Sequence, residues 1–174
     1  DVIEELPKQL QKIKGLLEKD EAELAFDLAC GLGASNELVF SELLKQCSID
    51  RDGSLFLPPW IKSNSRGINH TRFFVRLLGV CPECVDLDPT LNKHSIKQLI
   101  LNEWNVEIET ELLRPFHQVE ELHLRSISIQ SLKEIAFLEH LQTLHLHHAD
   151  QLESLEDLYF FEELKSFVDE IWSY

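Results

Sequence analysis

The second half of the chain is built on an apolar pattern that repeats every 22 or 23 residues. The pattern is an apolar residue, two variable positions, a second apolar residue, one variable position and a third apolar residue. Complete copies start at Ile96, Val119 and Leu141, and a partial copy starts at Leu164. The apolar residues that follow each copy repeat as well, as Leu132, Ile135 and Leu138 and then as Leu155, Leu158 and Phe161. A unit this short cannot bury its apolar residues alone, so neighbouring units must stack on one another.

This pattern resembles the short repeats of the leucine-rich repeat superfamily over about residues 94–174. The resemblance implies a solenoid of about three to four units with a small parallel sheet, to which each unit contributes one strand. The asparagine that usually follows the strand in this family is absent here, because His148 or Ala149 stands near its place. Since Asp169 replaces an apolar residue in the last unit, we expect a capping unit, with Trp172 and Tyr174 folded over its end. A longer array cut at this point is the alternative.

The resemblance also implies a binding face. In this family the residues between the inward leucines of each strand point to the concave face, which generally binds other proteins. Because neighbouring parallel strands lie about 4.8 Å apart, equivalent residues of successive units should form columns. Three columns are expected, and in the last unit they continue as Ser166, Val168 and Glu170. The implied partner-binding residues are Gln98, Ile100, Asn102, Glu121, His123, Arg125, Thr143, His145 and His147.

Residues 1–92 are predicted to be a mainly helical region that covers the other end of the repeats. Apolar residues at helical spacing predict three short antiparallel helices in the first 50 residues. The second helix is expected to begin with a capping box formed by Asp20 and Glu23. The apolar stripes expected on the three helices are Leu6, Leu10, Ile13 and Leu17; Leu24, Leu28 and Leu32; and Val39, Phe40, Leu43 and Leu44.

Residues 48–68 interrupt the helical pattern and are predicted to form a hairpin and a loop. Asp52-Gly53 between two apolar residues is a hairpin signal. Asn69 is then expected to cap a helix that ends at about Leu78. This helix should turn Phe73, Phe74, Leu77 and Leu78 inward, with Arg72 and Arg76 on its other face. The expected fold class is therefore mixed α/β (α+β), with a helical region at 1–92 and the repeats at 93–174.

The segment Cys81-Pro82-Glu83-Cys84 has the cysteine spacing of half a zinc site or of a redox-active pair. A structural zinc site needs further ligands, and only His94 follows nearby. A redox pair belongs at the start of a helix after a strand, whereas this pair follows the end of a predicted helix. We therefore interpret the segment as a structural turn. The chain has four cysteines, which we expect to be reduced thiols.

The columns would place His123, His145 and His147 next to one another, and three imidazoles can hold zinc. The side chains of a curved sheet splay apart, however, so the pattern favours a polar, partly solvated face, and no metal or cofactor is expected. Histidines titrate near neutral pH and repel one another when charged. A partner that engages His123 and His145 should therefore bind differently at pH 5.5 and 7.5.

Charge excludes some classes of partner. The chain carries 31 acidic and 16 basic residues, a net charge of −15, which argues against nucleic acid and anionic membranes. Residues 96–174 alone carry −11, whereas residues 51–95 carry +2 and can complement the acidic flanks of their own molecule. The first residues lack the basic start and apolar stretch of a secretory signal, and the apolar runs are too short for a membrane span. These features predict a cytoplasmic protein.

Two functions fit these features. The first is a protein–protein interaction module, an adaptor or scaffold that binds a partner of unknown identity on the concave face. The alternative is an acidic inhibitor or immunity-type protein that blocks a basic enzyme, because its charge would steer a cationic partner. The sequence carries no nucleophile–base motif, phosphate loop or pair of catalytic acids, so we do not expect an enzyme.

Overall fold

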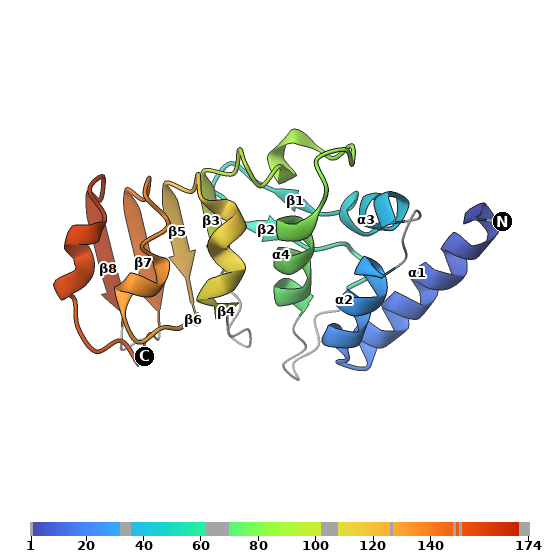
Figure 1. The fold of residues 1–174 in the computed structure, drawn as a ribbon, viewed down its shortest axis with the longest axis horizontal. Helices are drawn as coiled ribbons and strands as arrows, with labels where there is room; N and C mark the ends of the chain where they lie inside the picture. The colour runs from blue at the N-terminus through green and yellow to red at the C-terminus, as the bar shows by residue number, and fades with distance from the viewer. Residues whose placement is uncertain are drawn as a thin grey trace.

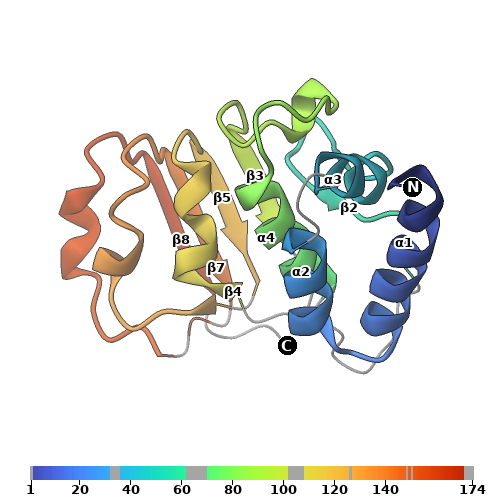
Figure 2. The same ribbon diagram turned by 45° about the vertical axis from the view of Figure 1, so that its right-hand side comes forward.

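The protein is a mixed α/β protein, with helices at one end and a four-stranded parallel sheet at the other (Figures 1 and 2). The structure is a computed structural model. It describes residues 2–31, 36–61, 70–101, 108–125, 127–147, 149 and 151–170. None of the helices in these ranges is long and apolar enough to cross a membrane.

Three helices open the chain: α1 (Val2–Glu18), α2 (Ala22–Cys30) and α3 (Asn36–Leu44). The prediction of three helices in this region is confirmed. On α1 the buried residues include Ile13 and Leu17, and α3 buries Val39, Phe40, Leu43 and Leu44, as their spacing predicts.

The face that α2 buries differs from the prediction. Leu24 is 56% exposed, and the buried residues are Ala22, Ala25 and Ala29. Leu28 is half-buried, and Leu32 lies outside the described residues. The alanines lie on the side of α2 that packs into the core, where their small side chains let the helix approach its neighbours closely. The prediction that the leucines form the inward face of α2 is therefore wrong.

The predicted capping box at the start of α2 is wrong. The N-cap residue is Glu21, whose side chain makes no capping hydrogen bond. Asp20 adopts the left-handed conformation with φ of 59°, which closes the turn after α1. The Glu23 carboxylate instead pairs with two arginines of α4. A long-range ion pair has thus replaced the local bond that the spacing suggested.

Helix α4 (His70–Val80) is the predicted fourth helix, and its four predicted inward residues are all buried. Phe73 and Phe74 pack edge to face with ring centroids 5.1 Å apart. On the other face, Arg76 pairs with Glu23 of α2 at 3.0 Å, and Arg72 bridges Glu23 to Glu109 of β4. Arginines of the basic segment 51–95 thus pair with acidic residues that precede and follow this segment in the chain, in line with its net positive charge.

The predicted hairpin is confirmed. Strands β1 (Ser48–Ile49) and β2 (Leu55–Phe56) pair antiparallel. In the turn, the Asp50 carboxylate accepts hydrogen bonds from the backbone N–H groups of Asp52 and Ser54. Gly53 has φ of +90°, and its carbonyl oxygen accepts a hydrogen bond of 2.7 Å from the backbone N–H of Ile100. The hairpin therefore lies against the first strand of the parallel sheet.

The parallel sheet has the strand order β3 (Gln98–Leu101), β5 (Glu121–Leu124), β7 (Thr143–His147) and β8 (Ser166–Glu170). Its register confirms the first two of the three columns predicted from the repeat. Gln98, Glu121, Thr143 and Ser166 are paired in one row. Ile100, His123, His145 and Val168 are paired in the next.

A helical segment follows each of the first three strands of this sheet. These segments are η3 (Thr110–Phe116), η4 (Leu132–Ile135) and η5 (Glu156–Phe160), and they lie along one side of the sheet (Figure 2). A short parallel pair, β4 (Ile108–Glu109) with β6 (Ile127–Ser128), and the segment η2 (Pro89–Leu91) complete the fold. The core between the sheet and these segments is mainly aliphatic, with Phe116 of η3 among the buried residues; its aliphatic members include Leu99, Leu122, Leu124, Ile135, Leu144 and Leu146.

Burial decreases towards the last unit. Leu132 of η4 is fully buried, whereas Leu155, one repeat later, is 48% exposed. Asp169 pairs with Leu146 in the register, so a charged residue ends the buried column. The expected packing of Trp172 and Tyr174 over this end lies outside the described residues.

Candidate functional site

The face of the sheet that points away from the helical segments carries the predicted binding residues. We call it the outer face and define it by Gln98, Ile100, Glu121, His123, Arg125, Thr143, His145 and His147. Along each strand buried and partly exposed residues alternate, so these side chains are all at least partly accessible. Asn102, the ninth predicted residue, lies outside the described residues.

Three imidazoles lie side by side on the outer face. The rings of His123 and His145, on neighbouring strands, have centroids 5.1 Å apart. The rings of His145 and His147 stack with centroids 4.3 Å apart and planes 20° from parallel. The His123 Nε2 lies 2.9 Å from a carboxylate oxygen of Glu121, which anchors one end of the row. We call Glu121, His123, His145 and His147 the histidine row.

Arg125 belongs to the same face, and the register brings it to the end of the row. Leu124 pairs with Leu146, so the next residues on the two strands, Arg125 and His147, lie at neighbouring positions. The structure thus joins a carboxylate, three imidazoles and a guanidinium on two strands. Within the described residues, no group of three His, Cys, Asp or Glu side chains has the arrangement of a metal site.

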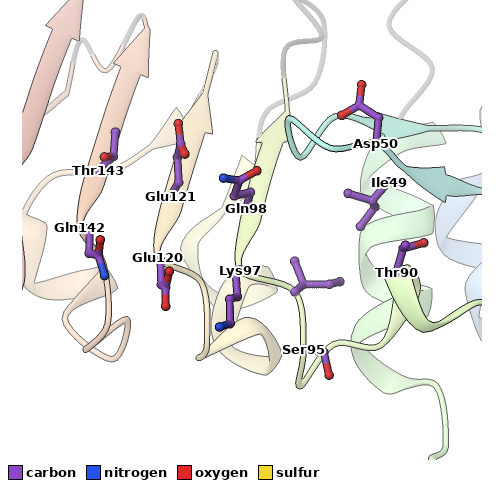
Figure 3. Close-up of a pocket in the computed structure, with 11 residues that line it drawn as sticks. Ile49, Asp50, Thr90, Ser95, Lys97, Gln98, Glu120, Glu121, Gln142 and Thr143 are labelled. Carbon is purple, nitrogen blue, oxygen red and sulfur yellow. The ribbon is translucent and has the colours of Figure 1, made fainter.

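A pocket of about 440 Å³ opens where the first row of the outer face meets the hairpin (Figure 3). Gln98, Glu121 and Thr143 line it from three neighbouring strands. Ile49 and Asp50 line it from the hairpin. Figure 3 shows a second row of side chains beside the first: Lys97, Glu120 and Gln142. Thr90 of η2 and Ser95, on the segment between η2 and β3, complete its polar wall.

Sequence reasoning found only part of this pocket. It identified Gln98, Glu121 and Thr143, but missed the residue immediately before each of them. Those three residues obey the same repeat, so the period itself was a signal for a second row. Nothing in the sequence indicated that Ile49 and Asp50 would join them, because the contact depends on how the hairpin packs against β3.

The cysteine pair has the properties of the structural turn that its position suggests. Cys81 is buried, and burial raises the pKa of its thiol to about 11. Cys84 is exposed, and its thiol donates a hydrogen bond to Glu37, which raises its pKa. Raised pKa values keep both thiols protonated at neutral pH, whereas a reactive cysteine needs a lowered one. All four cysteines are free thiols.

Comparison with known proteins gives no match to a family model, a curated protein or a solved structure. The candidate function therefore depends on the geometry of the outer face and its pocket.

Proposed function

We propose that residues 96–170 form a short solenoid of the leucine-rich repeat type and that its outer face binds a protein partner. One observation carries this proposal: equivalent polar residues of successive units stand in register across one face of a parallel sheet, while the other face is filled with leucine. A sheet built in this way presents rows of side chains on a rigid frame, as repeat proteins use for binding.

The solenoid is supported by the unit that recurs along the chain. Each of the first three units contains a strand and, after it, a helical segment, and the strands stack in chain order. The N-terminal region covers one end of this stack, because the hairpin bonds to β3 and α4 packs against η3. At that contact, a methyl group on Gly79 would meet the ring of Pro115. The helical region then acts as a cap for the first unit.

The outer face suits binding better than chemistry. Its groups are imidazoles, amides, hydroxyls and carboxylates that are partly exposed to solvent, and Glu121 is already bonded to His123. We therefore propose an adaptor or scaffold with no reaction of its own. An acidic inhibitor of a basic enzyme is the second candidate, favoured by the −15 net charge and by the carboxylates around the pocket.

Affinity capture from source lysate, read by mass spectrometry, tests the proposal. The face variant changes Glu121, His123, Arg125, His145 and His147 to Ala. The control variant changes Lys133, Glu139 and Glu153 to Ala, which are exposed residues outside the outer face. We expect a partner that the native chain and the control retain and the face variant loses, with all three chains folded by circular dichroism. Equal retention by all three would refute the outer face as the site.

Salt dependence separates the two candidate functions. An inhibitor that works by charge should lose its association rate steeply as ionic strength rises, because salt screens long-range attraction. The association rate of an adaptor that binds mainly through close contacts should change much less with ionic strength. Association rates of the captured partner at about 0.05 and 0.5 M salt make this comparison.

A further inference from the structure

The pocket beside the outer face is a defined cavity with walls from separate parts of the chain. Its size, about 440 Å³, lies within the range of ordinary ligand sites. The hairpin contributes the aliphatic side chain of Ile49, and the buried Ile96 lies two residues before β3. Gln98, Gln142, Thr143, Thr90 and Ser95 add amide and hydroxyl groups to the same pocket (Figure 3). The pocket thus offers an apolar surface next to polar groups.

The charges around the pocket are unequal. Asp50, Glu120 and Glu121 line it against a single basic residue, Lys97. Two of these carboxylates are already engaged, since Asp50 accepts two backbone hydrogen bonds and Glu121 bonds to His123. Glu120 forms no ion pair within the described part of the chain. Its carboxylate is therefore available to a ligand, in a concave site where the neighbouring carboxylates add to the negative potential.

The complementary ligand has an aliphatic stem and a cationic head. Lysine and arginine side chains combine these two properties, because they bury their methylene groups on apolar surface while the charged end stays polar. An arginine can also form two parallel hydrogen bonds to one carboxylate. An anion would face three carboxylates, and a fully apolar group would leave the polar wall without partners.

We propose that this pocket receives a lysine or arginine side chain of the protein partner, with its charged head at Glu120 and its stem directed towards the apolar end of the pocket, which Ile49 and Ile96 form. The inference rests on the proposed function, because it assigns the chemistry of the partner that the outer face binds. Since the pocket continues the first row of that face, a partner lying across the strands can insert one basic side chain at the end of its footprint.

A small probe tests the pocket without the partner. The ¹⁵N-labelled full chain is titrated with Nα-acetyl-arginine N-methylamide at about 0.05 M salt and followed by amide chemical shifts. The matched probe is Nα-acetyl-norleucine N-methylamide, which has an alkyl side chain and no charge. We expect saturable shifts for Glu120, Glu121, Gln142 and Thr143 with the arginine probe only. The affinity should be millimolar, because one side chain makes few contacts.

Three variants sharpen the result. Glu120→Gln should weaken binding of the arginine probe about three- to tenfold, and Lys97→Gln should tighten it about twofold because it removes a like charge. Glu139→Gln, an exposed change away from the pocket, should leave it unchanged. Equal binding of both probes, equal effects of Glu120→Gln and Glu139→Gln, or shifts that spread over the acidic surface without saturating would each overturn the proposal. Such a failure concerns the pocket alone, since lysate capture tests the proposed function separately.

Discussion

Gly53 of the hairpin lies so close to Gln98 of β3 that a Cβ atom on Gly53 would stand 2.7 Å from the Gln98 carbonyl carbon. The contact is with backbone, which cannot move aside as the end of a side chain can. Gly53 also has φ of +90°, a conformation that other residues rarely adopt. This contact holds the hairpin, whose Ile49 and Asp50 line one end of the pocket, against β3.

We therefore expect Gly53→Ala to destabilise the protein by about 2–4 kcal/mol, from backbone strain and displacement of β3. Gly15→Ala is the matched control. Gly15 lies inside α1 with nothing within 4 Å of its added Cβ, so alanine should stabilise the helix by about 0.5–1 kcal/mol. Urea unfolding followed by circular dichroism measures both. A Gly53→Ala protein as stable as the native chain would contradict the close contact.

The ion pairs of α4 predict a pH dependence of stability. The hydrogen bond from Arg72 holds the pKa of Glu23 below its ordinary value. A carboxylate with a lowered pKa in the folded state stabilises the fold above its unfolded pKa, about 4.3. This contribution to stability is lost as pH falls through the pKa that Glu23 has in the folded protein. Native protein should therefore exceed Glu23→Gln in stability at pH 7, by about 1 kcal/mol since Glu23 is largely exposed.

The difference between native protein and Glu23→Gln should shrink as pH falls below about 4.3. Urea unfolding at pH 7, 5 and 3.5 measures it. The control is Glu18→Gln, an exposed carboxylate near the end of α1, which should change stability by less than about 0.5 kcal/mol. A difference between native and Glu23→Gln that stays constant from pH 7 to 3.5 would show that the arginine pairing contributes nothing.

Two leucines at the same repeat position differ in burial, so they show whether burial or repeat position sets the stability cost of a substitution. Leu132 and Leu155 occupy the same place in successive units, but Leu132 is fully buried and Leu155 is 48% exposed. Leu132→Ala should cost about 3 kcal/mol, through lost burial and a cavity. Leu155→Ala should cost less than about 1 kcal/mol. Urea unfolding measures both variants. If they lose equal free energy of unfolding, Leu155 is as deeply buried as Leu132, contrary to the structure.

The histidine row predicts that partner binding depends on pH. Histidine side chains in general gain positive charge near neutral pH. The row has Glu121 at one end, and Arg125 and Glu170 occupy the register positions next to His147. A basic partner should then bind more weakly at pH 5.5 than at pH 7.5. Changing His123, His145 and His147 together to Gln should remove most of this pH dependence. The control is His117→Gln, at an exposed histidine that follows η3, which should keep it.

Affinity measured at the two pH values decides this prediction. Equal affinity at pH 5.5 and 7.5 for the native chain would exclude the histidine row from the contact. A dependence that survives the triple change would assign it to other groups, including those of the partner.

Much of the architecture followed from local patterns. The 22–23-residue period predicted the strands and their register, because stacking units must align equivalent residues. Asp52-Gly53 predicted the hairpin, and the spacing of Phe73, Phe74, Leu77 and Leu78 predicted the inward face of α4. One local signal was overlooked: Ser131 and Glu134 form a complete capping box at η4, in the spacing that identifies one.

The sequence by itself determined the periodic parts of this protein: the helices, the hairpin, and the two faces of the parallel strands. Only the tertiary structure decided where these parts meet. It buried the alanines of α2 rather than Leu24, turned Glu23 from a cap into a partner of Arg72, and brought Asp50 and Glu121 to the wall of one pocket. The physical reason is that periodicity reflects local geometry, whereas these choices depend on close packing and charge pairing between residues distant in the chain.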